Sequence, residues 1–202
     1  MANQLIDLLV ERFDVISIGR SKPLNEKVTW HKLDFTNNVE FGNVFEGVDT
    51  LIHLVNLTKV SEDLDEKVIG NLCEEAKRFS IKSFIYISSV RVYGSQCGVL
   101  TEDAELNALP EDSYGCQKGK NEKLLGTLLG GSGIKLIIAR LGNVITEDAL
   151  WKFPETVTLK NLVLNGNTHP HYIYVANAAS AIGWLVTNAD KIKKRIYNIT
   201  RE

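Results

Sequence analysis

The residues whose chemistry is most distinctive are a serine, a tyrosine and a lysine between positions 82 and 122. Ser89 ends an apolar run, and Tyr114 and Lys118 follow it, four residues apart. A helix that begins near Ser113 would set the phenol and the ammonium on one face, because four residues are slightly more than one helical turn. The spacing therefore predicts a pair of groups that can work together on a proton.

A nearby cation would help this tyrosine to exchange a proton. A free tyrosine has a pKa of about 10, and a cation lowers that value by stabilising the phenolate. Lys118 could supply the cation, while Ser89 could hold a substrate oxygen as Tyr114 takes or gives its proton. The alternative is an ordinary exposed tyrosine and lysine pair on a helix, and the four-residue spacing alone favours that alternative.

Composition limits the class of protein. The 202 residues, of which 44% are hydrophobic, can bury one good core, so we expect a single domain over residues 1–202. The formal net charge of −2 gives no electrostatic reason to propose nucleic acid or an anionic membrane as the partner. No apolar stretch reaches the ~20 residues of a membrane span, and the three cysteines form no CxxC motif, so we expect a soluble cytoplasmic protein with reduced thiols.

Periodicity predicts alternating strands and helices. Helical spacing of apolar residues occurs in segments 3–13, 61–79 and 176–189, and strand-like runs occupy 14–20, 28–35, 50–55, 83–88, 134–140, 172–175 and 196–200. The run 50–55 is broken only by His53, which we expect to be a packed, hydrogen-bonded core residue. His169 and His171 supply too few ligands for a metal, so we predict no metal site.

Three spaced motifs resemble the extended branch of the short-chain dehydrogenase/reductase family, which includes nucleotide-sugar epimerases and dehydratases. They are FIYISSVRVYG at 84–94, PEDSYGCQK at 110–118 with Glu122 after it, and IARLGNV at 138–144. Weaker matches at 33–37, 49–56 and 172–175 follow in the family's order, so the resemblance covers nearly all of the chain. It implies an α/β fold, namely a Rossmann-like doubly wound parallel sheet.

The resemblance also implies a set of catalytic roles. Tyr114 would transfer the proton of the substrate oxygen, Lys118 would lower the pKa of the tyrosine and hold the nicotinamide ribose, and Ser89 would orient the substrate oxygen. Asn143 would lie near the substrate. On this basis the substrate would be a nucleotide sugar or a similar hydroxyl or ketone compound.

Cofactor contacts are implied in the same way. Gly19 stands where an acidic residue would bind the ribose of NAD, and it is followed by Arg20 and Ser21, which favours NADP, with NAD possible. Asp34 and Phe35 would lie beside the adenine, and the backbone at Leu54 and Val55 would pass under the cofactor. Two alternatives remain open, because segment 19–22 also fits a polar surface turn and Asp34 also fits the start of a helix toward Phe45.

The chain departs from the family in several places. It opens with a helix where the family has a strand and a glycine-rich turn, so we expect an N-terminally incomplete sheet with a gap between the family's second and fourth strands. A longer gene product, a strand from another chain and a closed-up sheet all remain open as explanations. Residues 144–175 would be the remnant of a reduced C-terminal substrate lobe, and Lys67 replaces an asparagine of the family's proton relay. Val90 and Arg91 replace the acidic pair of the dehydratases, which disfavours a 4,6-dehydratase.

Two functions therefore stand side by side. The first is an NAD(P)-dependent oxidoreductase or epimerase, and the second is a truncated, non-catalytic relative that binds a nucleotide or a protein partner. Members of the family commonly pair through two helices, which in this chain are 61–79 and 114–130, so a homodimer is a further expectation.

Overall fold

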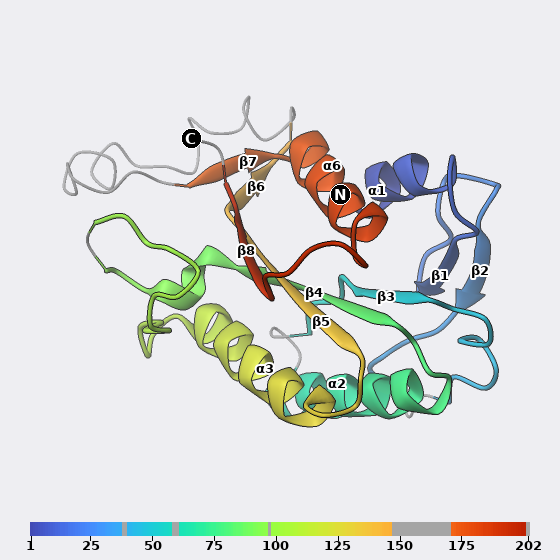
Figure 1. The fold of residues 1–202 in the computed structure, drawn as a ribbon, viewed down its shortest axis with the longest axis horizontal. Coiled ribbons are helices and arrows are strands. Elements are labelled where there is room, and N and C mark those ends of the chain that lie inside the picture. Colours follow the sequence, from blue (N-terminus) through green and yellow to red (C-terminus); the bar gives the residue numbers. More distant parts are fainter. Residues whose placement is uncertain (38–39, 58–60, 97, 147–170, 201–202) are drawn as a thin grey trace.

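The computed structural model describes residues 1–202 except 38–39, 58–60, 97, 147–170 and 201–202 (Figure 1). The described elements are α1 (Ala2–Leu9), β1 (Ile16–Gly19), β2 (Thr29–Lys32), β3 (Thr50–His53), α2 (Glu62–Arg78), β4 (Ser83–Ser89), the 3-10 helix η1 (Val90–Tyr93), α3 (Ser113–Leu129), β5 (Lys135–Leu141), β6 (Asn143–Ile145), β7 (Tyr172–Tyr174), α6 (Val175–Thr187) and β8 (Ile196–Ile199).

The helices cover both faces of a parallel sheet, with α1 and α6 on one side and α2 and α3 on the other (Figure 1). Alternation along β4 explains this layering, since successive side chains of a strand point to opposite faces. Phe84 and Tyr86 join the core that contains α2 and the end of α3, whereas Ile85 and Ile87 join the core beneath α1 and α6. Because both faces are buried, β4 is apolar along most of its length.

The parallel strands form separate sheets. The largest sheet has the order β3-β4-β5-β8, while β1 pairs with β2 and β6 pairs with β7. All of the pairings are parallel. The α/β fold class is therefore confirmed, and so is the predicted break between the pair β1-β2 and β3.

Helix caps decide where the site helices begin. Ser61 caps α2 by accepting a hydrogen bond from the backbone N–H of Leu64 at 3.4 Å, as its sequence position predicts. The cap of α3 is Asp112, whose carboxylate accepts from the N–H of Gly115 at 3.0 Å. The helix thus begins at Ser113, which places Tyr114 in its first turn.

Two sequence predictions need correction, and a third lies mostly outside the described residues. The expected helix toward Phe45 is absent from the described residues there, which form turns around Phe41 and Phe45 that bury both rings in the core. Helix α1 ends at Leu9, four residues before the predicted limit at Phe13. Most of the predicted lobe remnant at 144–175 lies outside the described residues.

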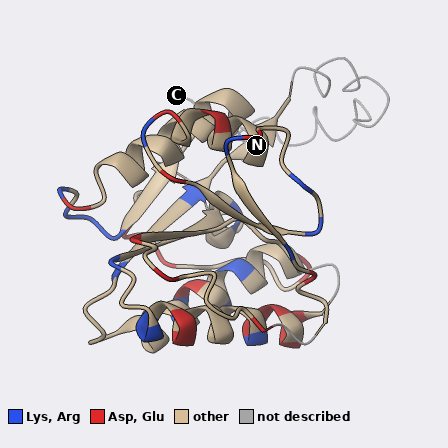
Figure 2. Cartoon of the chain, turned by 90° about the vertical axis from the view of Figure 1, so that its right-hand side faces the viewer, with Lys and Arg blue, Asp and Glu red and all other residues tan. Residues whose placement is uncertain are grey.

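Charge is distributed evenly over the outer helices. Figure 2 shows acidic and basic positions interspersed along the helices on the lower side of the sheet. Within the described part of the chain, no helix is both long enough and apolar enough to cross a bilayer.

Candidate functional site

Ser89, Tyr114 and Lys118 come together where β4 ends. The phenol of Tyr114 lies close enough to the Ser89 hydroxyl to feel its influence, and the Nζ atom of Lys118 donates to the carbonyl of Ile87 at 2.8 Å. The same Nζ atom lies 5.8 Å from the centre of the Tyr114 ring. Because this is the carboxyl end of a parallel strand, the three groups lie at the edge of the sheet where ligands bind in open α/β folds.

Burial shifts the pKa values of the tyrosine and the lysine in opposite directions, because it favours the uncharged form of each. It raises the pKa of Tyr114, while the Ser89 hydroxyl and the charge of Arg91 lower it. Burial lowers the pKa of Lys118 to about 8, against the opposing effect of the Asp65 and Glu122 carboxylates. In the free chain the cation that lowers the pKa of Tyr114 is Arg91, and the expected effect of Lys118 on this pKa stays a prediction.

A polar cluster lies behind Lys118 between α2 and α3, and it was not predicted. Asn121 donates to the carboxylate of Asp65 at 2.7 Å and to the hydroxyl of Tyr86 at 3.0 Å, and it accepts from Gln117 at 3.1 Å. Asp65 stands in the first turn of α2, where an acidic residue commonly complements the helix dipole from the surface, yet only 3% of this residue is exposed. Lys67, expected behind the tyrosine, is exposed instead. The helical spacing of Asp65 with Val68 and Leu72 was the available signal.

His53 is buried as expected, but its environment differs from the prediction. It stacks on Tyr86 with 5.5 Å between the ring centres. Neither ring nitrogen has a hydrogen-bond partner among the described residues. Burial, together with the charge of Lys118, lowers the pKa of His53 to about 3. The residue is therefore a neutral core residue rather than a proton donor.

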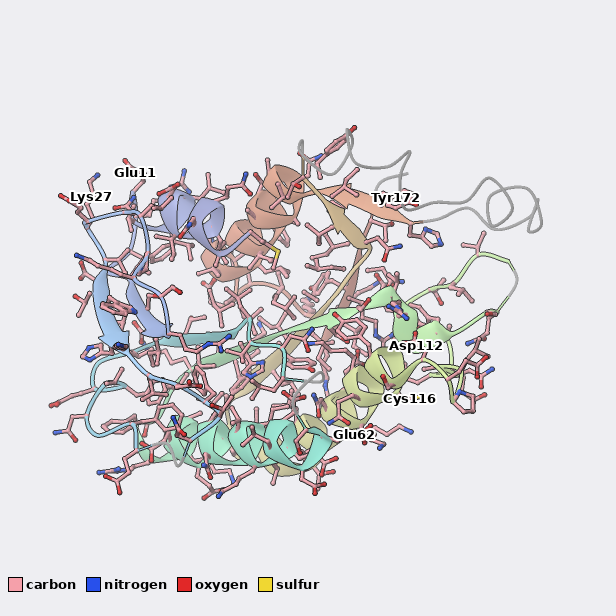
Figure 3. The ribbon with its side chains drawn as sticks, turned by 180° about the vertical axis from the view of Figure 1, so that it is seen from behind. Glu11, Lys27, Glu62, Asp112, Cys116 and Tyr172 are labelled. Atoms are coloured by element: carbon pink, nitrogen blue, oxygen red, sulfur yellow. The ribbon has the colours of Figure 1, made fainter. Side chains whose placement is uncertain are left out.

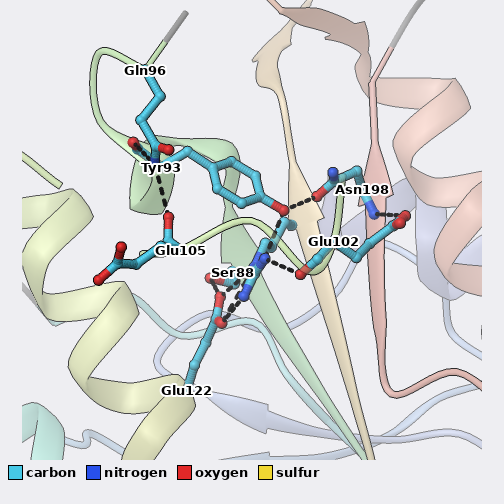
Figure 4. A network of polar contacts seen from close by, with 8 residues as sticks. Ser88, Tyr93, Gln96, Glu102, Glu105, Glu122 and Asn198 are labelled. Carbon is cyan, nitrogen blue, oxygen red and sulfur yellow. Dashed lines mark hydrogen bonds and ion pairs between the residues drawn. The ribbon is translucent and has the colours of Figure 1, made fainter. Parts of the chain in front are cut away.

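A buried ion pair joins α3 to β5 beside the site. Arg140 donates from Nη2 to Glu122 at 2.6 Å and from Nε at 3.1 Å, and the Oε1 atom of Glu122 also accepts from the hydroxyl of Ser88 at 2.5 Å (Figure 4). Both charged side chains are at most 4% exposed. Since Glu122 lies one turn after Lys118, the ion pair and the Ser88 bond hold this part of α3 against β5 and β4.

The same arginine continues the network into the loop after η1. Its Nη1 atom donates to the hydroxyl of Tyr93 at 2.6 Å and to the carbonyl of Glu102 at 3.1 Å. Tyr93 in turn donates to Asn198 on β8 at 2.7 Å, and the N–H of Asn198 donates to the Glu102 carboxylate at 3.1 Å (Figure 4). Gln96 bonds to the carbonyls of Tyr93 and Glu105, which holds the loop together. The loop after η1 is thus attached to two strands, to β5 through Arg140 and to β8 through Asn198.

The predicted cofactor residues follow the ends of three strands. Arg20 and Ser21 come directly after β1 and are exposed, and Asp34 follows β2. Asp34 accepts from the N–H and hydroxyl of Thr36, and these bonds and the charge of Arg20 hold its pKa below the usual value. Phe35 differs from the expectation, because it is buried against Phe41 in the core.

Two further predictions concern the middle of the sheet and the substrate side. Leu54 and Val55 follow β3 and are half-buried. Asn143 begins β6, where its side chain is exposed and its N–H donates to the carbonyl of His171 at 2.7 Å. The structure brings Asn143 into no described contact with Ser89 or Tyr114. In the described ranges, no group of three or more His, Cys, Asp or Glu side chains is placed to hold a metal ion.

Comparisons with known proteins find relatives over almost the whole chain. Residues 3–200 match the model of the NAD dependent epimerase/dehydratase family. A dTDP-D-glucose 4,6-dehydratase of Dictyostelium discoideum is 25% identical over 88% of this chain and 47% of its own length. The chain thus spans less than half the length of this relative, and 22–39% of the other curated relatives it matches.

Solved structures share the fold. MoeE5 in complex with UDP-glucose and NAD has a TM-score of 0.75 at 16% identity, covering 98% of this chain and 72% of that chain. A UDP-N-acetylglucosamine 4-epimerase from Methanobrevibacter ruminantium M1, in complex with UDP-N-acetylmuramic acid, has a TM-score of 0.74 at 20% identity, covering 98% and 72%. At these identities the likeness concerns the fold alone.

Proposed function

Because this chain belongs to the NAD dependent epimerase/dehydratase family, we propose that it is an NAD(P)-dependent oxidoreductase or epimerase acting on a nucleotide sugar or a similar hydroxyl or ketone compound. The observation that carries the proposal is the meeting of Ser89, Tyr114 and Lys118 at the carboxyl end of β4. Packing alone does not require these three residue types together, whereas proton transfer to a substrate oxygen does.

The geometry divides the work among the three residues. Ser89 would hold the substrate oxygen, and Tyr114 would give or take the proton of that oxygen through its phenol. Lys118 would act from the sheet side, where the carbonyl of Ile87 fixes its Nζ atom. A half-buried tyrosine whose pKa is raised by burial keeps its proton at neutral pH, so Tyr114 is ready to act as the acid when a keto group is reduced.

The residues at the strand ends suit parts of a nicotinamide dinucleotide. The Nζ atom of Lys118 uses one of its three N–H bonds on Ile87, which leaves two donors for a ribose hydroxyl pair. Arg20 and Asp34 lie close enough to interact, at the ends of β1 and β2, where they would meet the adenosine. When bound, the nicotinamide would exchange a hydride with the substrate carbon. No residue is assigned to the pyrophosphate.

Two observations point to different dinucleotides. The solved structures of MoeE5 and of UDP-Glucuronic acid 4-epimerase from Bacillus cereus hold NAD. Arg20 and Ser21, in place of an acidic residue, would favour NADP. We therefore propose NAD(P) as the cofactor, and the preference for NADP stays a prediction. Two expectations, a cytoplasmic location and a homodimer through α2 and α3, also stay predictions.

Fluorescence titration tests the proposal on this chain. We expect the emission of NADH or NADPH to change as the protein is added, and we expect turnover with UDP-glucose, UDP-N-acetylglucosamine or UDP-glucuronic acid. Tyr114→Phe should abolish turnover and leave dinucleotide binding nearly unchanged, because it removes only the transferable proton. Lys120→Gln, an exposed change on the same helix, is the matched control and should preserve both.

Two outcomes would contradict the proposal. Absence of any emission change at millimolar dinucleotide would mean that this chain holds no cofactor. Loss of dinucleotide binding in Tyr114→Phe would mean that the tyrosine serves the cofactor rather than the proton.

A specific observation also supports the second candidate, a non-catalytic relative that binds a nucleotide or a protein partner. Among the strands that the structure describes, β1 and β2 pair only with each other, so the two parts of a dinucleotide site lie on different sheets. Binding of a dinucleotide without turnover of any of the three sugar nucleotides would favour this candidate.

A further inference from the structure

Two cations flank the ring of Tyr114. The guanidinium carbon of Arg91 lies 5.4 Å from the ring centre, and the Nζ atom of Lys118 lies 5.8 Å from it. Both distances fall within the range in which a cation interacts with an aromatic ring. Arg91 belongs to η1, directly beyond Ser89, so it reaches the tyrosine from the loop side rather than from α3.

A carboxylate holds Arg91 in this position. Asp112 accepts from the Nε atom at 2.8 Å and from an Nη atom at 2.7 Å, a two-point contact that fixes the plane of the guanidinium. Asp112 also caps α3, and Figure 3 places it at the first turn of that helix. The backbone N–H of Arg91 donates to the hydroxyl of Ser89 at 3.3 Å. The arginine therefore contacts both Ser89 and the ring of Tyr114.

Gly115, the residue after the tyrosine, leaves room for Asp112 and Arg91 because it has no side chain. A Cβ atom on Gly115 would lie 2.7 Å from the Asp112 carboxylate and 2.8 Å from the carbonyl of Arg91. Real Cβ atoms do not come so close to a carbonyl, so a larger residue would push Asp112 and Arg91 away from α3. Close approach of η1 to the first turn of α3 thus depends on a glycine beside Tyr114.

We propose that Arg91, held by Asp112, is a positioning residue that stabilises the phenolate of Tyr114 during proton transfer. This inference rests on the proposed function for its role in turnover, but its electrostatic part concerns the free protein. When the phenol gives its proton to a substrate oxygen, the O–H bond of the tyrosine breaks, the substrate gains an O–H bond, and the negative charge stays on Tyr114. The guanidinium lies where it can stabilise that charge.

Arg91 suits this role better than Lys118 for a physical reason. An arginine keeps its charge throughout the accessible pH range, whereas burial lowers the pKa of Lys118 to about 8. Above that pH the lysine is largely neutral and Arg91 is the cation that remains. The other groups that face the tyrosine are Ser89, the Asp112 carboxylate and the phenol of Tyr86. The negative charge of Asp112 raises the pKa of Tyr114 and so offsets part of the lowering by Arg91.

The test is a direct titration of the tyrosine in the unliganded protein. We would place 3,5-difluorotyrosine at position 114 by suppression of a stop codon and follow its single ¹⁹F resonance with pH. The fluorines bring the phenol pKa into a range where the fold is stable. Arg91→Gln should raise this pKa by about half a unit to one unit, a value reduced for the half-exposed side chain.

Two matched variants separate charge from structure. Arg91→Lys keeps the charge and should restore at least half of the shift, whereas Lys120→Gln removes an exposed cation from the same helix and should leave the resonance titration unchanged. A pKa unchanged within 0.2 units in Arg91→Gln would overturn the proposal, and so would equal shifts in the glutamine and lysine variants. Since neither cofactor nor substrate is present, failure here is distinct from failure of the proposed function.

Discussion

Removing one charge of the Glu122–Arg140 pair should destabilise the protein strongly. In Glu122→Gln the guanidinium of Arg140, whose side chain is 3% exposed, would keep only uncharged acceptors, the hydroxyl of Tyr93 and the carbonyl of Glu102. Breaking a buried ion pair by removing one partner costs about 3–5 kcal/mol, because the remaining charge has lost its compensation. We expect the free energy of unfolding to fall by about that amount.

Urea unfolding followed by circular dichroism measures this loss. With a urea dependence of about 3 kcal/mol per molar, the midpoint should move down by roughly 1–1.7 M. The control is Glu62→Gln, which removes the partner of Lys120 in a pair whose side chains are 56% and 44% exposed. Exposed pairs contribute about 0.2–1 kcal/mol, so the control midpoint should move by about 0.3 M or less.

Equal, small shifts in both variants would refute the reasoning, because they would mean that Arg140 reaches water when its partner is neutral. A second comparison tests the same cause. Adding Arg140→Met to Glu122→Gln should recover part of the lost stability, since it removes the uncompensated charge.

Two further predictions concern buried groups near the site. His53 has a folded pKa of about 3 against the ordinary 6.5, so the unfolded chain binds its proton first as the pH falls; stability should drop through this group by about 2 kcal/mol at pH 5, and urea midpoints at pH 7 and pH 5 should differ less in His53→Phe than in the wild type. An equal pH dependence in the variant would exclude His53 as the cause. Gly115→Ala should cost about 1–3 kcal/mol in thermal unfolding, because its Cβ would meet Asp112, while Gly70→Ala on α2, where the space is open, should stabilise by about 0.5–1 kcal/mol. Shifts of the same sign in the two glycine variants would contradict the packing argument.

Local pattern was sufficient to predict most of the elements. Most strands and the helix α2 follow from apolar periodicity, and Ser61 follows from capping preference. The pairing of Tyr114 with Lys118 was also predictable, because spacing along one helix determines which side chains share a face. Each of these features depends on residues that are near one another in the sequence.

The partners of the site residues could not be predicted in this way. Asp65 looked like an ordinary first-turn acid, yet α3 covers it and Asn121 binds it. Arg91 looked like a simple departure from a motif, and only the approach of η1 to α3 brings it to the ring of Tyr114. Phe35 was expected beside a ligand and is in the core instead.

The sequence by itself determined which residues could do chemistry and on which elements they lie, since residue type and helical or strand spacing are local properties. The tertiary structure decided their electrostatics, because burial and charge depend on side chains brought from far along the chain. Glu122 meets Arg140 across 18 residues, and Asp112 meets Arg91 across 21. Tyr114 could be identified from the sequence, whereas the position of Arg91 beside its ring is seen only in the folded chain.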